Sequence, residues 1–251
     1  MWKFFHQLAS PPHFYRLSKI LIPVLAVPGY ALVGYGLFAG LFLAPADYQQ
    51  GDAFRIIYVH VPSAYLSMMA YMIMAVAGGI GLIWRMKLAH AVAASAAPIG
   101  ASFTFLALAS GAIWGRPMWG TYWEWGDPRM MSELILLFLY FGYMALRGAI
   151  DDVTKADKAS AVLALVGAVN VPIIHYSVEW WSSLHQGPTL MKEGGSGMQD
   201  PAMLYPLLAS ILGFTLVFGA MLLRRVRTEV LYRQRRTRWV REMILAPEGQ
   251  S

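Results

Sequence analysis

Six long apolar runs dominate this sequence and constrain its fold more than any other feature. They cover residues 20–43, 58–84, 89–114, 132–146, 159–176 and 203–223. A helix of about 20 apolar residues is long enough to cross the hydrocarbon core of a bilayer. Since helices keep all their backbone hydrogen bonds internal, they are the usual way for such runs to cross a membrane. We therefore expect an all-α integral membrane protein with six transmembrane helices, forming a single membrane domain.

The composition agrees with a membrane protein and removes several kinds of chemistry. Hydrophobic residues make up 57% of the chain and charged residues 14%, whereas about a quarter of the residues in soluble domains are charged. No cysteine is present, which excludes disulfides, thiolate metal sites and thiol catalysis. The N-terminal segment lacks the small-residue cleavage site of a secretory signal peptide.

The basic residues predict the orientation of the helices. Of the 20 Lys and Arg residues, 16 fall in four segments, namely 1–19, 85–88, 147–158 and 224–251. Cytoplasmic loops of membrane proteins are enriched in Lys and Arg. We therefore expect both termini to be cytoplasmic. The three outer loops are then expected at about 44–57, 115–131 and 177–202.

The basic tail over 224–251 is expected to bind anionic lipid or a cytoplasmic partner. Nucleic-acid binding is disfavoured, because that function needs a folded basic face with groups that read or stack on bases.

The outer loops contain the residues best suited to bind a ligand. The second loop includes WGTYWEWGDPRM, in which Trp119, Trp123 and Trp125 fall within seven positions. His60 lies in the first turn of the second apolar run, and His185 lies in the third loop. Tryptophans at this level can form a membrane-interface belt or a platform for a flat ligand. Their concentration in one segment favours the platform.

A metal site held by the protein alone is disfavoured. Tetrahedral zinc needs three or four His, Cys or carboxylate ligands, and the chain has no cysteine and no histidines four positions apart. Iron in a porphyrin needs only one or two axial ligands, commonly His. Two outer histidines and an aromatic loop match that need. We expect His175, ten residues before His185, to be a packed polar residue and not a ligand.

The stretch WGTYWEWGDPR resembles the tryptophan-rich WWD signature, W-G-x-x-W-x-W-D, of haem-handling proteins in cytochrome c biogenesis. Four further stretches are similar to the cytochrome c maturation protein C (CcmC) family: FAGLFLAPADYQQGDAFRIIYVHVPSA, WGRPMWGTYW, SELILLFLY and NVPIIHYSVEWWSSLHQG. The resemblance covers nearly the whole chain and is weakest in the C-terminal tail. One departure is that Gly126 separates Trp125 from Asp127, which leaves the position of the aspartate open.

The resemblance implies a bacterial inner-membrane protein that binds haem b as a transient cargo on the periplasmic side. By resemblance, His60 and His185 are the axial ligands of the haem iron. The other residues implied to contact the haem are Trp119, Gly120, Trp123, Trp125 and Asp127.

The propionates of haem are anionic, so the outer arginines are candidate partners for them. These are Arg55, Arg116 and Arg129. We prefer Arg129 because it adjoins the tryptophan-rich stretch.

The resemblance also implies partners. Members of the family present haem to the membrane-anchored chaperone CcmE and promote its covalent attachment to a histidine of that chaperone. They work with the ABC transporter CcmA/CcmB and the small protein CcmD. On this basis we expect a haem-delivery factor instead of a conventional enzyme.

Three other functions compete with delivery. A permease would itself move haem across the membrane, and a b-type cytochrome subunit would hold haem between helix-borne histidines inside the bundle. Both of these alternatives stay open. A haem lyase is disfavoured because the short outer loops offer little room for an apocytochrome.

Overall fold

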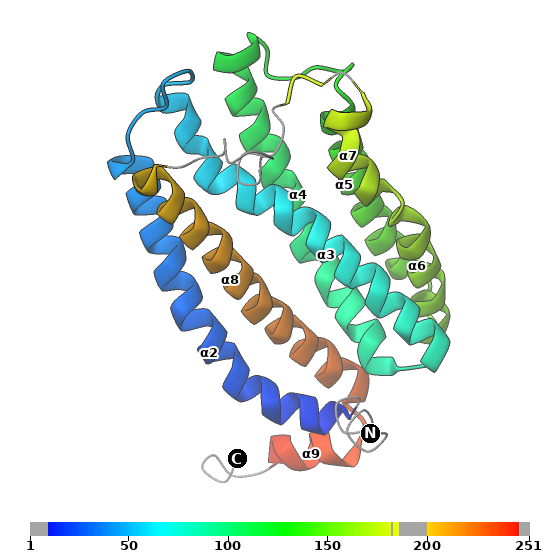
Figure 1. The fold of residues 1–251 in the computed structure, drawn as a ribbon. Coiled ribbons are helices and arrows are strands. Elements are labelled where there is room, and N and C mark those ends of the chain that lie inside the picture. The colour runs from blue at the N-terminus through cyan, green and yellow to red at the C-terminus, as the bar shows by residue number, and fades with distance from the viewer. Residues whose placement is uncertain (1–9, 182, 186–199, 246–251) are drawn as a thin grey trace.

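The computed structural model describes residues 10–181, 183–185 and 200–245, which form a bundle of helices without strands (Figure 1). The α-helices are α2 (Pro11–Phe38), α3 (Ile57–Trp84), α4 (Lys87–Trp119), α5 (Pro128–Gly148), α6 (Val153–Gly167), α7 (Asn170–Trp180), α8 (Pro201–Gln234) and α9 (Arg238–Leu245). A π-helical turn, η1 (Ala39–Leu43), extends α2, and a 3-10 helix, η2 (Asp52–Ile56), leads into α3. The middle of the third predicted outer loop, 186–199, lies outside the described residues, as do 1–9 and 246–251 of the predicted cytoplasmic ends.

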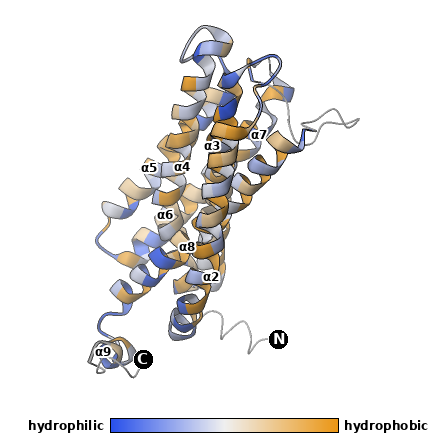
Figure 2. Cartoon of the chain, turned by 90° about the vertical axis from the view of Figure 1, so that its left-hand side faces the viewer, coloured by the Kyte–Doolittle hydropathy of each residue, from blue (hydrophilic) through white to orange (hydrophobic). Residues whose placement is uncertain are grey.

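The predicted all-α class and number of spans are confirmed. Within the described residues, six helical segments are long and apolar enough to cross a membrane. They are Pro11–Leu43, Asp52–Trp84, Lys87–Trp119, Pro128–Gly148, Val153–Trp180 and Pro201–Gln234. Figure 2 shows hydrophobic residues along the helices and many of the hydrophilic ones toward the two ends.

The two ends of the bundle are named here by the segments that they carry. We term the end that carries residues 44–56, 120–127, 181 and 183–185 the site end. The opposite end, which carries 85–86, 149–152 and 235–245, is termed the basic end. The helix α2 begins, and α8 finishes, at the basic end (Figure 1).

Two closely packed helix pairs organise the bundle. The helix α3 packs along α4, and α2 packs along α8, while α5, α6 and α7 cover a further side (Figure 1). The buried face of α4 is rich in alanine, and small residues let membrane helices approach closely. The Tyr140 hydroxyl donates to the Ser67 carbonyl at 2.7 Å, and the Tyr140 ring meets the Tyr71 ring edge-on at 5.1 Å. These contacts fix α5 against α3.

Capping residues fix several helix ends. The helices α5, α6 and α8 each begin after an aspartate whose side chain accepts a backbone N–H of the first turn: Asp127, Asp152 and Asp200. The helix α4 ends at Gly120, whose φ of 78° is a left-handed conformation that favours glycine. The second predicted outer loop is therefore shorter than 115–131, because α4 extends to Trp119 and α5 begins at Pro128.

The fifth predicted run is two helices and not one. The helix α6 ends at Gly167 and α7 begins at Asn170. Pro172 explains the break, because it has no N–H to bond the Ala168 carbonyl and its ring crowds that group. The Asn170 side chain donates to the Ser132 carbonyl at 2.9 Å, which ties the start of α7 to α5.

The predicted basic tail begins as a membrane helix. The helix α8 continues to Gln234, so residues 224–234 belong to it, and the short helix α9 follows. The helix α3 begins at Ile57, close to the start of the second predicted run, and Pro62 lies inside it.

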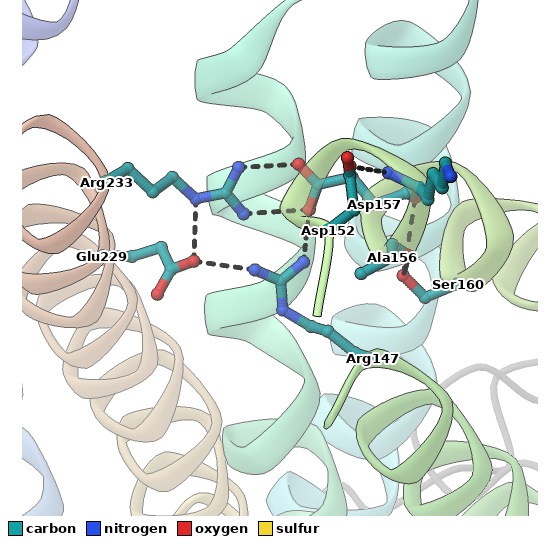
Figure 3. A network of polar contacts seen from close by, with 8 residues as sticks. Arg147, Asp152, Ala156, Asp157, Ser160, Glu229 and Arg233 are labelled. Atoms are coloured by element: carbon teal, nitrogen blue, oxygen red, sulfur yellow. Dashed lines mark hydrogen bonds and ion pairs between the residues drawn. The ribbon is translucent and has the colours of Figure 1, made fainter. Parts of the chain in front are cut away.

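A partly buried ionic network joins three helices at the basic end (Figure 3). Arg233 of α8 contacts both carboxylate oxygens of Asp157 of α6, at 2.7 and 3.0 Å. Glu229 of α8 accepts from Arg233 at 2.7 Å and from Arg147 of α5 at 2.9 Å. Arg147 also donates to Asp157. Two arginines and two acids thus neutralise one another within the bundle.

Candidate ligand-binding cavity

A cavity of about 580 Å3 lies at the site end between α3, α4, α5 and α7. This volume is within the range of small-molecule sites. Most of the lining side chains are apolar. The polar and charged ones are Gln50, His60, Tyr65, Arg129, Glu133, His175, Glu179 and His185.

His60, in the first turn of α3, lines this cavity with its Nδ1 already engaged. The Nδ1 atom lies 3.0 Å from the Ser110 hydroxyl of α4. That hydroxyl also lies 2.6 Å from the Leu106 carbonyl, to which it donates. A neutral ring with its proton on Nδ1 satisfies both groups at once, and this tautomer leaves Nε2 unprotonated. The ring meets Trp114 edge-on, with centroids 5.6 Å apart.

His185, in the segment that follows α7, lines the same cavity. Its Nδ1 lies 3.2 Å from Asp127 Oδ1 and 3.3 Å from Ser183 Oγ. Ser183 donates its own proton to Asp127 at 2.7 Å, so both neighbours accept from Nδ1–H. The neutral His185 ring is therefore also left with an unprotonated Nε2. Trp119 packs edge-on against it, with centroids 4.8 Å apart.

Asp127 is a buried carboxylate that joins the second and third loops. It accepts the backbone N–H of Met130 and that of Leu184, each at 2.9 Å. Burial opposes its ionisation, but hydrogen bonds from His185, Met130, Ser183 and Leu184 outweigh burial and hold the pKa of Asp127 well below its ordinary value. The carboxylate is therefore ionised at neutral pH.

The additional glycine before Asp127 is absorbed in a tight turn. The Asp127 N–H donates to the Glu124 carbonyl at 3.2 Å, and the Gly126 N–H donates to the Glu124 carboxylate at 3.1 Å. As a result of this turn, Asp127 lies directly before the first residue of α5 and caps that helix. The aspartate does not line the cavity, and it contacts His185 from behind the lining.

The three tryptophans of the predicted platform do not share one surface. Trp119 is the last residue of α4 and lines the cavity next to the capping Gly120. Trp123 and Trp125 pack against each other, with centroids 5.6 Å apart, and do not line the cavity. Trp125 is 72% exposed. Trp114, which the sequence did not single out, is the second indole of the cavity wall.

The three arginines expected near the site have different surroundings. Arg55 pairs with Asp52 at 2.9 Å, and Arg116 donates to the Gly120 carbonyl. Neither lines the cavity. Arg129 does line it, which agrees with the preference for this residue on sequence grounds.

Two ionisable residues of the cavity, Glu133 and Glu179, were missed on sequence grounds, and His175 was expected to be a packed residue. Glu133, one helical turn after Arg129, is 7% exposed, and its Oε1 has no hydrogen-bond partner among the described residues. A carboxylate within an apolar run marks a functional candidate, so SELILLFLY contained a usable signal. His175 and Glu179 lie one turn apart on α7 and also line the cavity. His175 is exposed, so the prediction that it is packed is wrong.

This arrangement suits a flat apolar ligand with a metal centre. No group of three or more His, Cys, Asp or Glu positioned for a metal ion occurs in the part of the chain that the structure describes. A porphyrin brings four nitrogens of its own and needs only one or two axial ligands. His60 and His185 both line the cavity, its walls are mainly apolar, and Arg129 can pair with a carboxylate.

Known proteins resemble this chain over almost its full length. The family model described as heme exporter protein C (CcmC) matches residues 4–241. Heme exporter protein C of Escherichia coli strain K12 is 52% identical over 245 residues, covering 98% of each chain. The protein of that name from Bradyrhizobium diazoefficiens is 49% identical over 92% of this chain and 86% of its own, and that from Paracoccus denitrificans is 42% identical over 91% and 94%. The chain therefore belongs to the heme exporter protein C family.

Proposed function

We propose that this protein binds haem in the cavity at the site end, with His60 and His185 as the axial ligands of the iron. One observation carries the proposal: both imidazoles line one cavity while the Nδ1 of each meets a hydrogen-bond acceptor. Histidines that ligate metals commonly engage their second ring nitrogen in this way. The names of the relatives, heme exporters, support haem as the cargo.

Haem b is held without a covalent bond, so the cavity walls supply much of the affinity. Burial of the apolar porphyrin faces contributes about 25 cal/mol per Å2. Edge contacts with the indoles of Trp114 and Trp119 add about 0.5–1.5 kcal/mol each. Arg129 pairs with a propionate through charge-assisted hydrogen bonds. Noncovalent binding keeps the haem a transient cargo.

The acceptor of this cargo is the haem chaperone CcmE. We place the site end at the periplasmic face of the bacterial inner membrane, because Lys and Arg concentrate at the opposite end. Trp123 and Trp125 lie outside the cavity wall and offer the chaperone an aromatic surface. The ABC transporter CcmA/CcmB and the small protein CcmD work with this protein in the same system.

Absorption spectra of the purified protein test the ligands. We expect the wild-type protein to show a six-coordinate, low-spin haem with two histidine ligands. His60→Ala and His185→Ala should each lose haem or show a changed axial spectrum. His175→Ala is the matched control, since this third imidazole lines the same cavity, and it should keep the wild-type spectrum. If His60→Ala and His185→Ala both keep it too, the ligand assignment is wrong.

Haem-dependent co-purification with CcmE tests delivery. Replacing Trp123 and Trp125 together should weaken trapping of the chaperone while haem content is retained. Replacing Trp119 should lower haem content itself, because this indole contacts His185. Unchanged trapping after replacement of all three tryptophans would exclude them from delivery.

Transport of haem across the membrane is the second candidate function. It is favoured by one observation, the word exporter in the names of the relatives. The purified protein, reconstituted alone into sealed vesicles, should fail to move haem to an enclosed haem-binding protein if delivery is its role. Accumulation of haem inside the vesicles would favour the permease.

A further inference from the structure

The carboxylate of Asp127 contacts a proposed iron ligand without reaching the cavity itself. We propose that Asp127 is a positioning residue, which holds His185 in the orientation and tautomer that iron ligation requires and does not touch the haem. This inference rests on the proposed function, and it replaces the expectation that Asp127 contacts the haem directly.

Both carboxylate oxygens of Asp127 accept hydrogen bonds from protein groups that hold the second and third loops together. Its Oδ1 accepts from the Met130 N–H at 2.9 Å and lies 3.2 Å from His185 Nδ1. Its Oδ2 accepts from the Ser183 hydroxyl at 2.7 Å and from the Leu184 N–H at 2.9 Å. The residue is 2% exposed and is absent from the cavity lining. Asp127 therefore acts on any cargo through His185.

The hydrogen bonds around His185 connect it to Ser183 and Asp127, which are also bonded to each other. Ser183 donates to Asp127 and accepts from the His185 backbone N–H at 3.1 Å. An ionised carboxylate can only accept, so Asp127 requires the proton of a neutral His185 ring to be on Nδ1. The Nε2 lone pair is then available to iron, and the ring is held against Trp119.

The two proposed ligands differ in the partner behind them. The partner of His60 Nδ1 is the neutral hydroxyl of Ser110, whereas the partner of His185 Nδ1 is a charged carboxylate. A carboxylate behind an imidazole raises the basicity of the ligand. We therefore expect His185 to be the stronger electron donor and to stabilise ferric iron more than His60 does.

A simpler role for Asp127 is the helix cap alone, since it also begins α5. Asp152 provides a matched control, because it caps α6 by accepting the Lys155 N–H at 2.9 Å and lies at the basic end. Replacing a residue that only caps a helix should change neither the haem affinity nor the reduction potential of the bound iron.

The test compares Asp127→Asn with Asp152→Asn in haem titrations and potentiometry of the purified full-length protein. Asp127→Asn should weaken haem binding on the order of 10–100-fold and shift the reduction potential to more positive values. Asp152→Asn should change neither quantity. Wild-type haem affinity and potential in Asp127→Asn would overturn the inference.

A second comparison separates positioning from general damage. On a His185→Ala background, Asp127→Asn should have no further effect on haem binding, because interacting residues are not additive. A full additional loss would show that Asp127 acts elsewhere. If Asp127→Asn does not fold, Ser183→Ala serves in its place and should shift the potential in the same direction by less, and an unshifted potential would count against the inference. A wild-type protein that binds no haem would instead defeat the proposed function.

Discussion

Asp127 is stabilising only while it is ionised, because four hydrogen bonds end on its carboxylate. Its pKa in the folded protein is below the ordinary value of 3.8. The stability that it contributes is therefore fully present above that ordinary value and is lost as the pH falls below it.

We expect the segment that carries His185 to separate from the second loop in acid. The measurement is hydrogen–deuterium exchange of the Leu184 amide, which donates to Asp127, corrected for the intrinsic pH dependence of exchange. Protection should be constant from neutral pH down to about pH 5 and should fall toward about pH 3. Asp127→Asn is the control and should be less protected throughout. Equal protection at about pH 3 and about pH 7 would contradict the assignment.

Glu133 is a buried carboxyl group whose Oε1 has no partner among the described residues. Leaving such an atom unsatisfied costs about 1–3 kcal/mol. Glu133→Met removes the carboxyl group and keeps a side chain of similar length, so it should raise the thermal stability of the haem-free protein. Glu179→Met, at an exposed residue of the same cavity, is the control and should change stability by no more than about 0.5 kcal/mol. A less stable Glu133→Met protein would show that the carboxyl group has a structural partner.

At the scale of the helices, the basic-end network holds α5, α6 and α8 together. Asp157 is 6% exposed and is contacted by both arginines. Asp157→Asn leaves those arginines short of one negative charge, and breaking a buried ion pair in this way costs about 3 kcal/mol. Thermal unfolding in detergent should show this loss. Glu242→Gln, in an exposed pair with Arg238 on α9, is the control and should cost less than about 1 kcal/mol. Equal stability of both variants would mean that the network adds nothing.

Some helix boundaries were predictable and others were not. Asp127 followed by Pro128, and Gly120 after an apolar run, are ordinary start and stop signals, yet the second outer loop was predicted too long. Pro172 was a usable sign of the break between α6 and α7. The extension of α8 through residues 224–234 was harder to foresee, because an arginine-rich stretch is typical of a solvated tail. In the structure, Arg233 forms an ion pair with Asp157, which lies 76 positions earlier in the chain.

At the scale of the whole molecule, orientation in the membrane is the main prediction. The chain has no cysteine, so single cysteines can be labelled without background. Tyr48→Cys lies at the site end, where Tyr48 is 90% exposed, and should react with a membrane-impermeant maleimide in intact spheroplasts. Thr237→Cys at the basic end should react only after the membrane is permeabilised. The unmodified protein is the control, and the reverse pattern of labelling would invert the topology.

The sequence by itself determined the class of the protein, its six spans and its family. These properties follow from local features: apolar runs of membrane length and motifs of adjacent residues such as WGTYWEWGDPR. It also identified His60, His185, Trp119 and Arg129, all of which line one cavity.

Only the tertiary structure decided which residues share that cavity and which support it from behind. It separated Trp123 and Trp125 from the cavity wall, added Glu133, His175 and Trp114 to it, and set Asp127 behind His185. The Asp127 and His185 contact joins residues 58 positions apart, and the Ser110 and His60 contact joins residues 50 apart. Such partners depend on how whole helices pack, because a hydrogen bond requires atoms to meet within about 3 Å and no local pattern in the sequence specifies that meeting.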